Sequence, residues 1–174
     1  MRQSLLAARD ALSAQARTEA AAALAQQAGG ANFQAFLPAG GAVIAGYCAI
    51  RSELEPALFL TALERRGFVL ALPRVTPAGL VFHRLEARQA LVKGAFGVAE
   101  PPPHWPVVLP ALVVTPLLAF DDAGYRLGYG RAFYDRVFKA HPEMARIGVA
   151  YSMQRVAEVP REAHDVPLNH VLVV

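Results

Sequence analysis

The sequence of 174 residues contains little cysteine and little lysine. Cys48 is the single cysteine, so no disulfide can form within the chain, and a reducing compartment is expected. Fifteen of the 17 basic residues are arginine, an excess that a GC-rich genome would also produce. The arginines are scattered and form no run of five or six, which argues against a nucleic-acid-binding arm. The net charge of +3 suits a small polyanionic ligand at least as well.

The chain also lacks an uninterrupted apolar run of membrane-spanning length. Residues 20–50 carry no charged side chain, but polar residues, glycines and a proline divide this stretch into short pieces. Charged residues near the N-terminus, in MRQSLLAARD, interrupt any apolar core of a secretory signal. We therefore expect a cytoplasmic protein that does not act at a membrane.

The composition predicts one globular domain. Apolar residues make up 55% of the chain and charged residues 18%, which excludes a disordered protein. A length of 174 residues allows one domain with a sizeable core but hardly two. Strand-like and helix-like segments alternate along the chain, so we predict a single α/β domain over residues 1–174, with a largely parallel open sheet flanked by helices.

Local patterns predict the helices. Residues 2–28 are good helix formers that end at two glycines, and Ser13 can cap a second segment, so we expect one broken helix or two successive helices. Ser52 and Glu55 form a capping-box pattern that predicts a helix ending near Gly67, with apolar positions at Leu54, Leu58 and Leu63. A further helix is expected at 131–140.

Short apolar runs predict the strands. They are expected at 41–47, 68–72, 80–85, 111–120, 146–151 and 170–174. Pro73 should close the second of these strands. The Gly- and Pro-rich segment 94–110 is expected to form a long surface connection.

Two common phosphate-binding loops are absent. No Gly-Lys-Ser/Thr of a Walker A loop occurs, and Phe133 stands where a dinucleotide fingerprint needs its third glycine. The chain instead contains FDDAGYRLGYGRAFYDR at 120–136, between a predicted strand and a predicted helix. Its glycines allow the backbone to approach a ligand, and the following helix offers unpaired N–H groups and the positive end of its dipole.

This segment indicates an anion site, most naturally for phosphate. Arg126, Arg131 and Arg136 can add charge-assisted hydrogen bonds, and Asp135 can hold the magnesium ion that accompanies a triphosphate. The alternative is a strand–turn–helix corner whose glycines, Gly124, Gly128 and Gly130, serve only the turn.

The longer segment TPLLAFDDAGYRLGYGRAFYDR resembles the signature of the 5-formyltetrahydrofolate cyclo-ligase family. In that family an apolar strand precedes Phe-Asp-x-x-Gly-x-Arg-Leu-Gly-x-Gly-Gly-Gly-Phe/Tyr-Tyr-Asp-Arg. Other pieces match in the family's order, namely LLAARDALS, GYCAIRSELE, LALPRV, GAFGVAEP and HDVPLNHVLVV. The resemblance covers nearly the whole chain and implies a Rossmann-like fold of the NagB/RpiA/CoA-transferase type.

The resemblance implies an ATP- and Mg²⁺-dependent enzyme that converts 5-formyltetrahydrofolate to 5,10-methenyltetrahydrofolate through a phosphorylated formyl group. Such catalysis consists mainly of positioning and charge stabilisation, which a glycine loop with arginines can provide. The enzyme is expected to be a monomer that acts on a small molecule, without a nucleic-acid or membrane partner. The alternative is an impaired homologue that binds folate or nucleotide without turnover.

The same resemblance assigns site residues. The residues implied to bind ATP are Arg2, Arg126, Leu127, Gly128, Tyr129, Gly130, Arg131, Ala132, Phe133 and Tyr134, and the candidate catalytic residues are Arg126, Tyr134 and Arg136. The residues implied to bind folate are Cys48, Glu53, Phe96, Tyr129, Arg131 and Phe133, and those implied to bind magnesium are Asp135 and Asp165.

Several of these residues also have a structural alternative. Glu53 can be a carboxylate in the first turn of a helix, favoured by the helix dipole. Cys48 can be a small buried apolar residue. Phe96 can belong to the core, Tyr134 can pack its helix, and Asp165 can be a turn residue.

Three positions depart from the family's pattern. The family usually begins Lys-x-x-Leu-Arg; Arg2 aligns with the arginine, so either the lysine lies upstream of Met1 or one ATP contact is missing. The usual Gly-Gly-Gly is Gly130-Arg131-Ala132, and the methyl of Ala132 costs about 1 kcal/mol if this position needs φ > 0, but nothing if it is helical. Asn169 replaces an acidic residue, which would loosen the magnesium end of the site.

Overall fold

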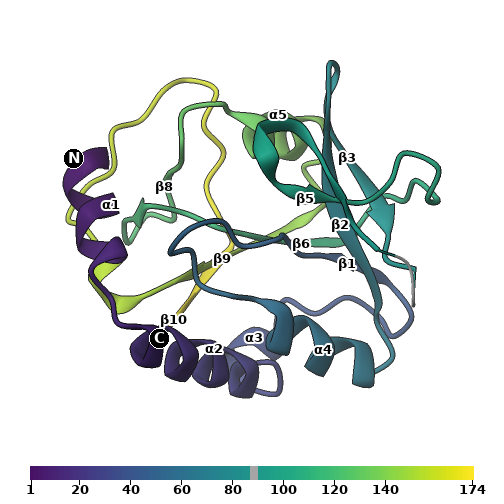
Figure 1. The fold of residues 1–174 in the computed structure, drawn as a ribbon, viewed down its shortest axis with the longest axis horizontal. Helices are drawn as coiled ribbons and strands as arrows, with labels where there is room; N and C mark the ends of the chain where they lie inside the picture. The colour runs from purple at the N-terminus through teal and green to yellow at the C-terminus, as the bar shows by residue number, and fades with distance from the viewer. Residues whose placement is uncertain (87–89) are drawn as a thin grey trace.

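A six-stranded sheet organises the chain in the computed structural model, which describes residues 1–86 and 90–174 (Figure 1). The strands are β1 (Val43–Ala45), β2 (Val69–Thr76), β3 (Gly79–Arg84), β6 (Leu112–Thr115), β9 (Ala145–Ala150) and β10 (His170–Val173). Their order is β10-β9-β6-β1-β2-β3, and every pairing is parallel except that of β2 with β3. The predicted α/β fold with a largely parallel sheet is confirmed.

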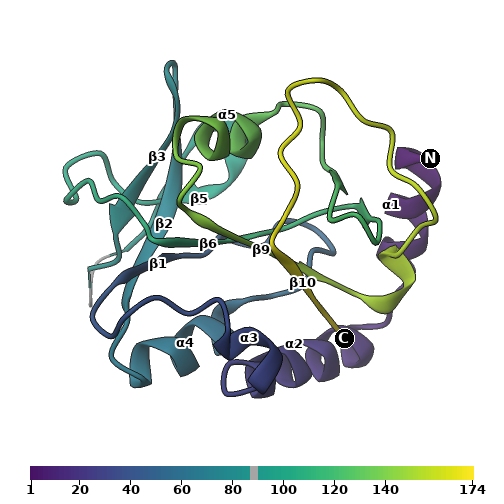
Figure 2. The same cartoon turned by 180° about the vertical axis from the view of Figure 1, so that it is seen from behind.

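Helices cover both faces of this sheet (Figures 1 and 2). They are α1 (Arg2–Asp10), α2 (Ala14–Gln27), α3 (Ala31–Gln34), α4 (Ala57–Arg65) and α5 (Phe133–Ala140). Helices α2, α3 and α4 lie on one face, and α5 lies on the other. No helix in the described part of the chain is long and apolar enough to cross a lipid bilayer.

Alternation along the central strands supplies a core to each face. Ile44 packs with the residues beneath α2 to α4, whereas its neighbour Ala45 packs with Phe138 of α5. Along β6, Leu112 and Val114 likewise face one cluster and Val113 the other. Successive side chains of a strand point to opposite faces, so a short, wholly apolar strand fills both halves of the core.

The predicted strand at 111–120 and loop at 121–130 are both more divided in the structure. Strand β6 ends before Pro116, which cannot donate a hydrogen bond to a neighbouring strand. The chain then forms the ribbon of β7 (Ala119–Phe120) and β8 (Arg126–Leu127), so two residues of the expected loop are paired. The short 3₁₀ helix η2 (Ser152–Gln154) follows β9.

The expected surface connection at 94–110 contains ordered elements. It includes the 3₁₀ turn η1 (Ala95–Gly97) and strand β5 (Ala99–Glu100), which pairs with β4 (Val92–Lys93). Residues 92–100 therefore form a small hairpin, here called the β4–β5 hairpin. Trp105, farther along this segment, is buried.

The predicted start of α4 is wrong. The helix begins at Ala57, and Ser52 does not cap it, because the Ser52 hydroxyl donates to Asp10 and accepts from Arg9. Leu58 is 53% exposed, and Phe59, Leu60 and Leu63 form the buried face instead. The predicted end is confirmed, since Gly67 follows the helix with φ +90°.

Pro73 does not close β2, which continues to Thr76. Strand β1 pairs with β2 only as far as Ala71, so beyond that point the strand has a partner on one side alone, in β3. A proline is tolerated where one side of a strand needs no donor.

At the N-terminus, two helices form, and the Ser13 hydroxyl accepts from the Ala16 amide at 3.1 Å, as a cap of α2.

Candidate functional site

The candidate site lies where the sheet changes its direction of winding. Strands β1 and β6 are neighbours, but the chain continues from β1 through α4 to β2 on one side and from β6 through α5 to β9 on the other. Ligands of open α/β sheets bind beyond the carboxyl ends of strands at such a point. The segment after β1 carries Cys48 and Glu53, and the segment after β6 carries the glycine loop 124–132.

Glu53 is a buried carboxylate, only 6% exposed. Its Oε2 accepts a hydrogen bond from the Ile50 amide at 3.0 Å. Burial raises the pKa of Glu53 to about 7, and the Ile50 hydrogen bond, the charge of Arg9 and a hydrogen bond from Tyr129 oppose that rise. A pKa near 7 means that the Glu53 carboxyl group can gain or lose its proton near neutral pH. Glu53 does not belong to the first turn of α4, which begins at Ala57.

Tyr134 lies near this carboxylate, and Cys48 lies near Tyr134. Burial raises the pKa of the Tyr134 phenol, and the charges of Glu53 and Cys48 add to the rise while Arg126 opposes it. Burial likewise raises the pKa of the half-buried Cys48 thiol. Both groups are thus neutral at physiological pH and can offer contact or hydrogen bonds but not charge.

The glycine loop has a left-handed backbone at its end. Ala132 precedes α5 with φ 48° and ψ 26°. Its backbone is therefore left-handed and not helical, and this is the conformation in which the methyl group causes strain. Gly130 has φ +81°. At Gly128 the backbone has no positive φ, and a Cβ there would meet nothing within 4 Å. The described contacts of the fold therefore do not require glycine at 128.

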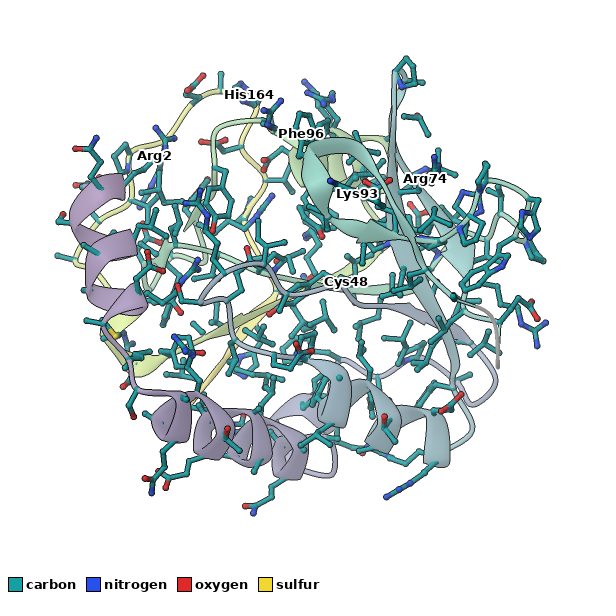
Figure 3. All side chains as sticks on the ribbon, in the orientation of Figure 1. Arg2, Cys48, Arg74, Lys93, Phe96 and His164 are labelled. Atoms are coloured by element: carbon teal, nitrogen blue, oxygen red, sulfur yellow. The ribbon has the colours of Figure 1, made fainter. Side chains whose placement is uncertain are left out.

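Arg2 lies against this loop, although it is distant in sequence. Its Nε donates to the Gly128 carbonyl at 3.1 Å, and its guanidinium is 3.8 Å from where a Cβ of Gly130 would stand. Figure 3 shows Arg2, His164, Phe96 and Lys93 along the upper part of the molecule, above Cys48. The predicted ATP contact from the N-terminus is thus beside the predicted phosphate loop.

The two predicted magnesium carboxylates are neighbours. Oδ1 of Asp135 accepts from the Arg126 guanidinium at 2.8 Å and from the Val166 amide at 3.1 Å, which fixes Asp135 beside Asp165. Oδ2 of Asp165 accepts from the Glu162 amide at 2.7 Å. Within the described residues no three candidate ligand side chains gather, so an ion here would take its remaining ligands from phosphate and water. That arrangement suits Mg²⁺, which usually keeps several waters beside one or two carboxylates.

Arg126 is directed at the protein and not at open space. Besides Asp135, its guanidinium donates to the Val166 carbonyl at 2.8 Å and lies 5.2 Å from the ring centroid of Phe138. Leu127 packs in the core with Ala119, so only its backbone can face a ligand. The side chains of these two loop residues therefore contact the protein itself.

The predicted folate contacts Phe96 and Arg131 touch each other. Phe96, at φ 60° in η1, is 61% exposed, which excludes a core role. The Arg131 guanidinium carbon lies 3.8 Å from the centroid of its ring. Arg136 stacks 5.1 Å from the Phe133 centroid and donates to the Arg131 carbonyl at 3.1 Å. The hairpin and the phosphate loop therefore meet over the site.

Asn169, the third departure, has a structural role. Its Oδ1 accepts from the Arg146 amide at 2.8 Å, and its own amide donates to the Arg146 carbonyl at 2.8 Å. It therefore begins the pairing of β10 with β9. The described contacts of Asn169 are with Arg146 and include neither magnesium candidate.

Sequence reasoning missed Arg9. It is 1% exposed and donates to Ser52, to the Leu117 carbonyl and to the Tyr129 hydroxyl. The available signal was a charged residue four positions after Leu5, on the inward face of the first helix. Such a position usually holds an apolar residue, so a buried arginine there indicates a specific set of hydrogen-bond partners.

Comparisons with known proteins point to one family. The model of the 5-formyltetrahydrofolate cyclo-ligase family matches residues 1–174. Proteins named 5-formyltetrahydrofolate cyclo-ligase from Haemophilus influenzae and Mycolicibacterium smegmatis are 33% and 34% identical to this chain. The matches cover 75% and 76% of this chain, and 74% and 73% of those proteins, respectively.

Solved structures agree with this result. The 5,10-methenyltetrahydrofolate synthetase of Aquifex aeolicus is 30% identical, with a TM-score of 0.81 over 99% of this chain and 87% of that one. The synthetase of Mycoplasma pneumoniae is 23% identical, with a TM-score of 0.73 over 98% of this chain and 94% of that one. The second likeness supports the fold alone.

Proposed function

The chain belongs to the 5-formyltetrahydrofolate cyclo-ligase family, and from this premise we propose that it converts 5-formyltetrahydrofolate to 5,10-methenyltetrahydrofolate in an ATP- and Mg²⁺-dependent reaction. Membership in a family of ligases confirms the prediction made from the glycine-rich signature. The cosubstrate, the metal, the intermediate and the residue roles given below are parts of the proposal.

The proposed reaction has two steps. The formyl oxygen forms a bond to the γ-phosphorus of ATP, whose bond to the β,γ-bridging oxygen breaks, so that ADP leaves. The folate N10 then attacks the activated formyl carbon and loses its proton, and the carbon–oxygen bond breaks as phosphate leaves. Both steps need the folate and the terminal phosphate to be held side by side, with the developing charge compensated.

The observation that carries the proposal is the position of Tyr129. This residue stands between Gly128 and Gly130 in the phosphate loop. Its hydroxyl accepts a hydrogen bond at 2.7 Å from Arg9, which also donates to Ser52, the neighbour of Glu53, and the Tyr129 side chain helps to lower the pKa of Glu53. A pterin whose ring N–H groups donate to Glu53 would therefore lie next to a phosphate bound by the loop. Direct transfer between two bound substrates requires this adjacency.

The other residues take roles around that pair. The loop backbone, the N-terminus of α5 and Arg2 would bind the phosphates of ATP, because exposed amides and a guanidinium suit an anion. Asp135 and Asp165 would hold Mg²⁺, whose chemistry is to neutralise charge on the transferring phosphate. Cys48, Phe96 and the remaining folate candidates would contact the pterin and its aromatic substituent.

Gly128→Ala tests the proposal with little risk to the fold. The added methyl has open space and no strained backbone, so the variant should unfold at the temperature of the wild type, yet the methyl would stand in the phosphate site. We expect the KM for ATP to rise at least tenfold, as measured by the absorbance of the methenyl product. Gly40→Ala, which also meets nothing within 4 Å, is the matched control and should behave as wild type.

Two outcomes would contradict the proposal. Wild-type protein that binds 5-formyltetrahydrofolate in calorimetry but yields no methenyl product with ATP and Mg²⁺ would favour the alternative of a binding protein without turnover. Unchanged ATP kinetics in Gly128→Ala would place the phosphates elsewhere. The expectations of a monomer and of a cytoplasmic location stay predictions, which light scattering and cell fractionation would test.

A further inference from the structure

Arg9 connects three separate segments of the site. Its Nε donates to the Ser52 hydroxyl at 3.1 Å, its Nη1 to the Leu117 carbonyl at 3.2 Å and its Nη2 to the Tyr129 hydroxyl at 2.7 Å. Ser52 precedes Glu53, Leu117 follows the carboxyl end of β6, and Tyr129 lies in the phosphate loop. One side chain thus spans both halves of the candidate site.

The fold alone does not explain a cation at this position. Arg9 is the buried residue of α1, and all three groups that accept its hydrogen bonds are uncharged. Burying a charge is costly, and replacing buried charges by apolar residues of similar size is often neutral or stabilising. A methionine or leucine would serve the packing of α1, so the guanidinium has another use.

The carboxylate that benefits from this charge is Glu53. The groups that face Glu53 electrostatically are Arg9 from α1, Tyr129 from the phosphate loop, Tyr134 from α5, Tyr47 from the end of β1 and Glu55 from its own segment. Arg9 is the cation in this set, and its charge lowers the pKa of Glu53 against the rise that burial causes. Glu55 acts in the opposite direction.

We propose that Arg9 is a positioning residue, which holds the folate carboxylate Glu53 and the phosphate-loop residue Tyr129 in one arrangement and supplies the positive charge facing Glu53. This inference rests on the proposed function, since it assigns Glu53 to the folate. An ionised carboxylate accepts a hydrogen bond from a pterin N–H group more strongly than a protonated one does, and the charge of Arg9 favours the ionised form near neutral pH. The shared bond network also fixes the distance between the two substrates before either one binds.

A titration without ligand tests the charge directly. Carbon-13 NMR of protein labelled at glutamate carboxyls would follow Glu53, assigned by the loss of its signal in Glu53→Gln. In Arg9→Met and Arg9→Gln we expect the titration midpoint of Glu53 to move above its wild-type value of about 7, whereas Arg9→Lys should keep it within a few tenths of a unit. An unchanged midpoint in both neutral variants would show that Arg9 is only structural.

Two neutral variants are used so that the titration can still be measured if one of them does not fold. Arg9→Gln can still donate to Tyr129 or Leu117, so it retains part of the network if Arg9→Met does not fold. Arg65→Met, on the exposed side of α4, is the control for loss of an arginine and should leave the midpoint unchanged. Thermal unfolding of each variant reports the structural loss separately from the titration.

Binding of 5-formyltetrahydrofolate across pH 6–9, without ATP, completes the test. Affinity should fall below the midpoint of Glu53, and in the neutral variants this fall should begin at higher pH, with a loss of about tenfold for each unit that the midpoint moves. Tyr129→Phe should weaken folate binding without moving the midpoint upward as far as Arg9→Met does. A wild type that binds no folate would overturn the proposed function itself, while a wild type that binds with the same pH profile as Arg9→Met would overturn only the role of Arg9.

Discussion

The guanidinium carbon of Arg131 lies 3.8 Å from the centroid of the Phe96 ring. This contact joins the tip of the β4–β5 hairpin to the phosphate loop, two segments that are 35 residues apart along the chain. Phe96 has a positive φ and is mostly exposed, so packing against the core does not hold it in place. The contact with Arg131 instead joins the exposed Phe96 ring to the loop.

Removing either member of the stack should weaken the hold on folate. An exposed cation–π contact contributes about 0.5–1 kcal/mol, so Arg131→Met should raise the KM for 5-formyltetrahydrofolate about twofold to fivefold. Phe96→Leu should act similarly, and the double variant should be little worse than either one, because both remove the same contact. Steady-state kinetics on the three variants would check this. Effects that simply add would show that the two residues contact folate independently.

Replacing Ala132 with glycine should stabilise the folded protein. Its φ of 48° places the methyl close to the following carbonyl, so Ala132→Gly should raise the free energy of unfolding by about 1 kcal/mol. Ala23→Gly, in the exposed middle of α2, is the matched control and should lower it by about 1 kcal/mol. Urea denaturation would measure both. A loss of stability in Ala132→Gly would mean that the left-handed backbone carries no strain.

The fold was predictable because its signals are local. The strands at 43–45 and 112–115 are short apolar runs that must be buried on both faces, and the Ser13 cap needs only its own helix. Pro73 was misjudged because its tolerance depends on which side of β2 has a neighbour, a property of the sheet and not of the segment.

The sequence places the candidate site residues on segments that the fold brings together, but it does not predict their hydrogen-bond partners. The loop and Asp135 lie in the signature, whereas Glu53 and Asp165 lie in two other segments that match the family, and hydrogen bonds of Asp135 to Arg126 and Val166 bring two of these segments together. The capping pattern at Ser52 failed because its true partners, Asp10 and Arg9, are 42 and 43 residues away. No local pattern carries that information, and the same holds for Arg126, whose nearest acceptors are Asp135 and the Val166 carbonyl.

Glu53 should reduce stability above neutral pH. Its pKa is about 7 in the folded chain against 4.5 in the unfolded one, so the folded chain keeps a proton that the unfolded chain releases. Stability attributable to this group therefore falls as pH rises from about 4.5 to about 7, by about 3 kcal/mol in all. Glu53→Gln should stabilise the protein by a similar amount at pH 8 and by about 1 kcal/mol or less at pH 5.

Denaturation of Glu53→Gln at both pH values would measure this difference, and the variant should bind folate poorly. Glu64→Gln, on an exposed position of α4, is the control and should change little at either pH. A gain of equal size at pH 5 and pH 8 would contradict the argument, because it would come from packing and not from ionisation.

Asp135 should contribute both to the stability of the fold and to Mg²⁺-dependent turnover, and a second substitution, at Arg126, can separate the two contributions. Asp135→Ala leaves the buried Arg126 guanidinium without its carboxylate, so we expect a loss of about 2 kcal/mol in the free energy of unfolding along with Mg²⁺-dependent turnover. Adding Arg126→Met removes the stranded charge and should restore most of that stability, but no turnover. Asp122→Ala, which breaks an exposed ion pair with Arg155, is the control and should cost less than about 1 kcal/mol. Denaturation curves and product absorbance across a Mg²⁺ series would decide, and turnover in the double variant would remove Asp135 from the magnesium site.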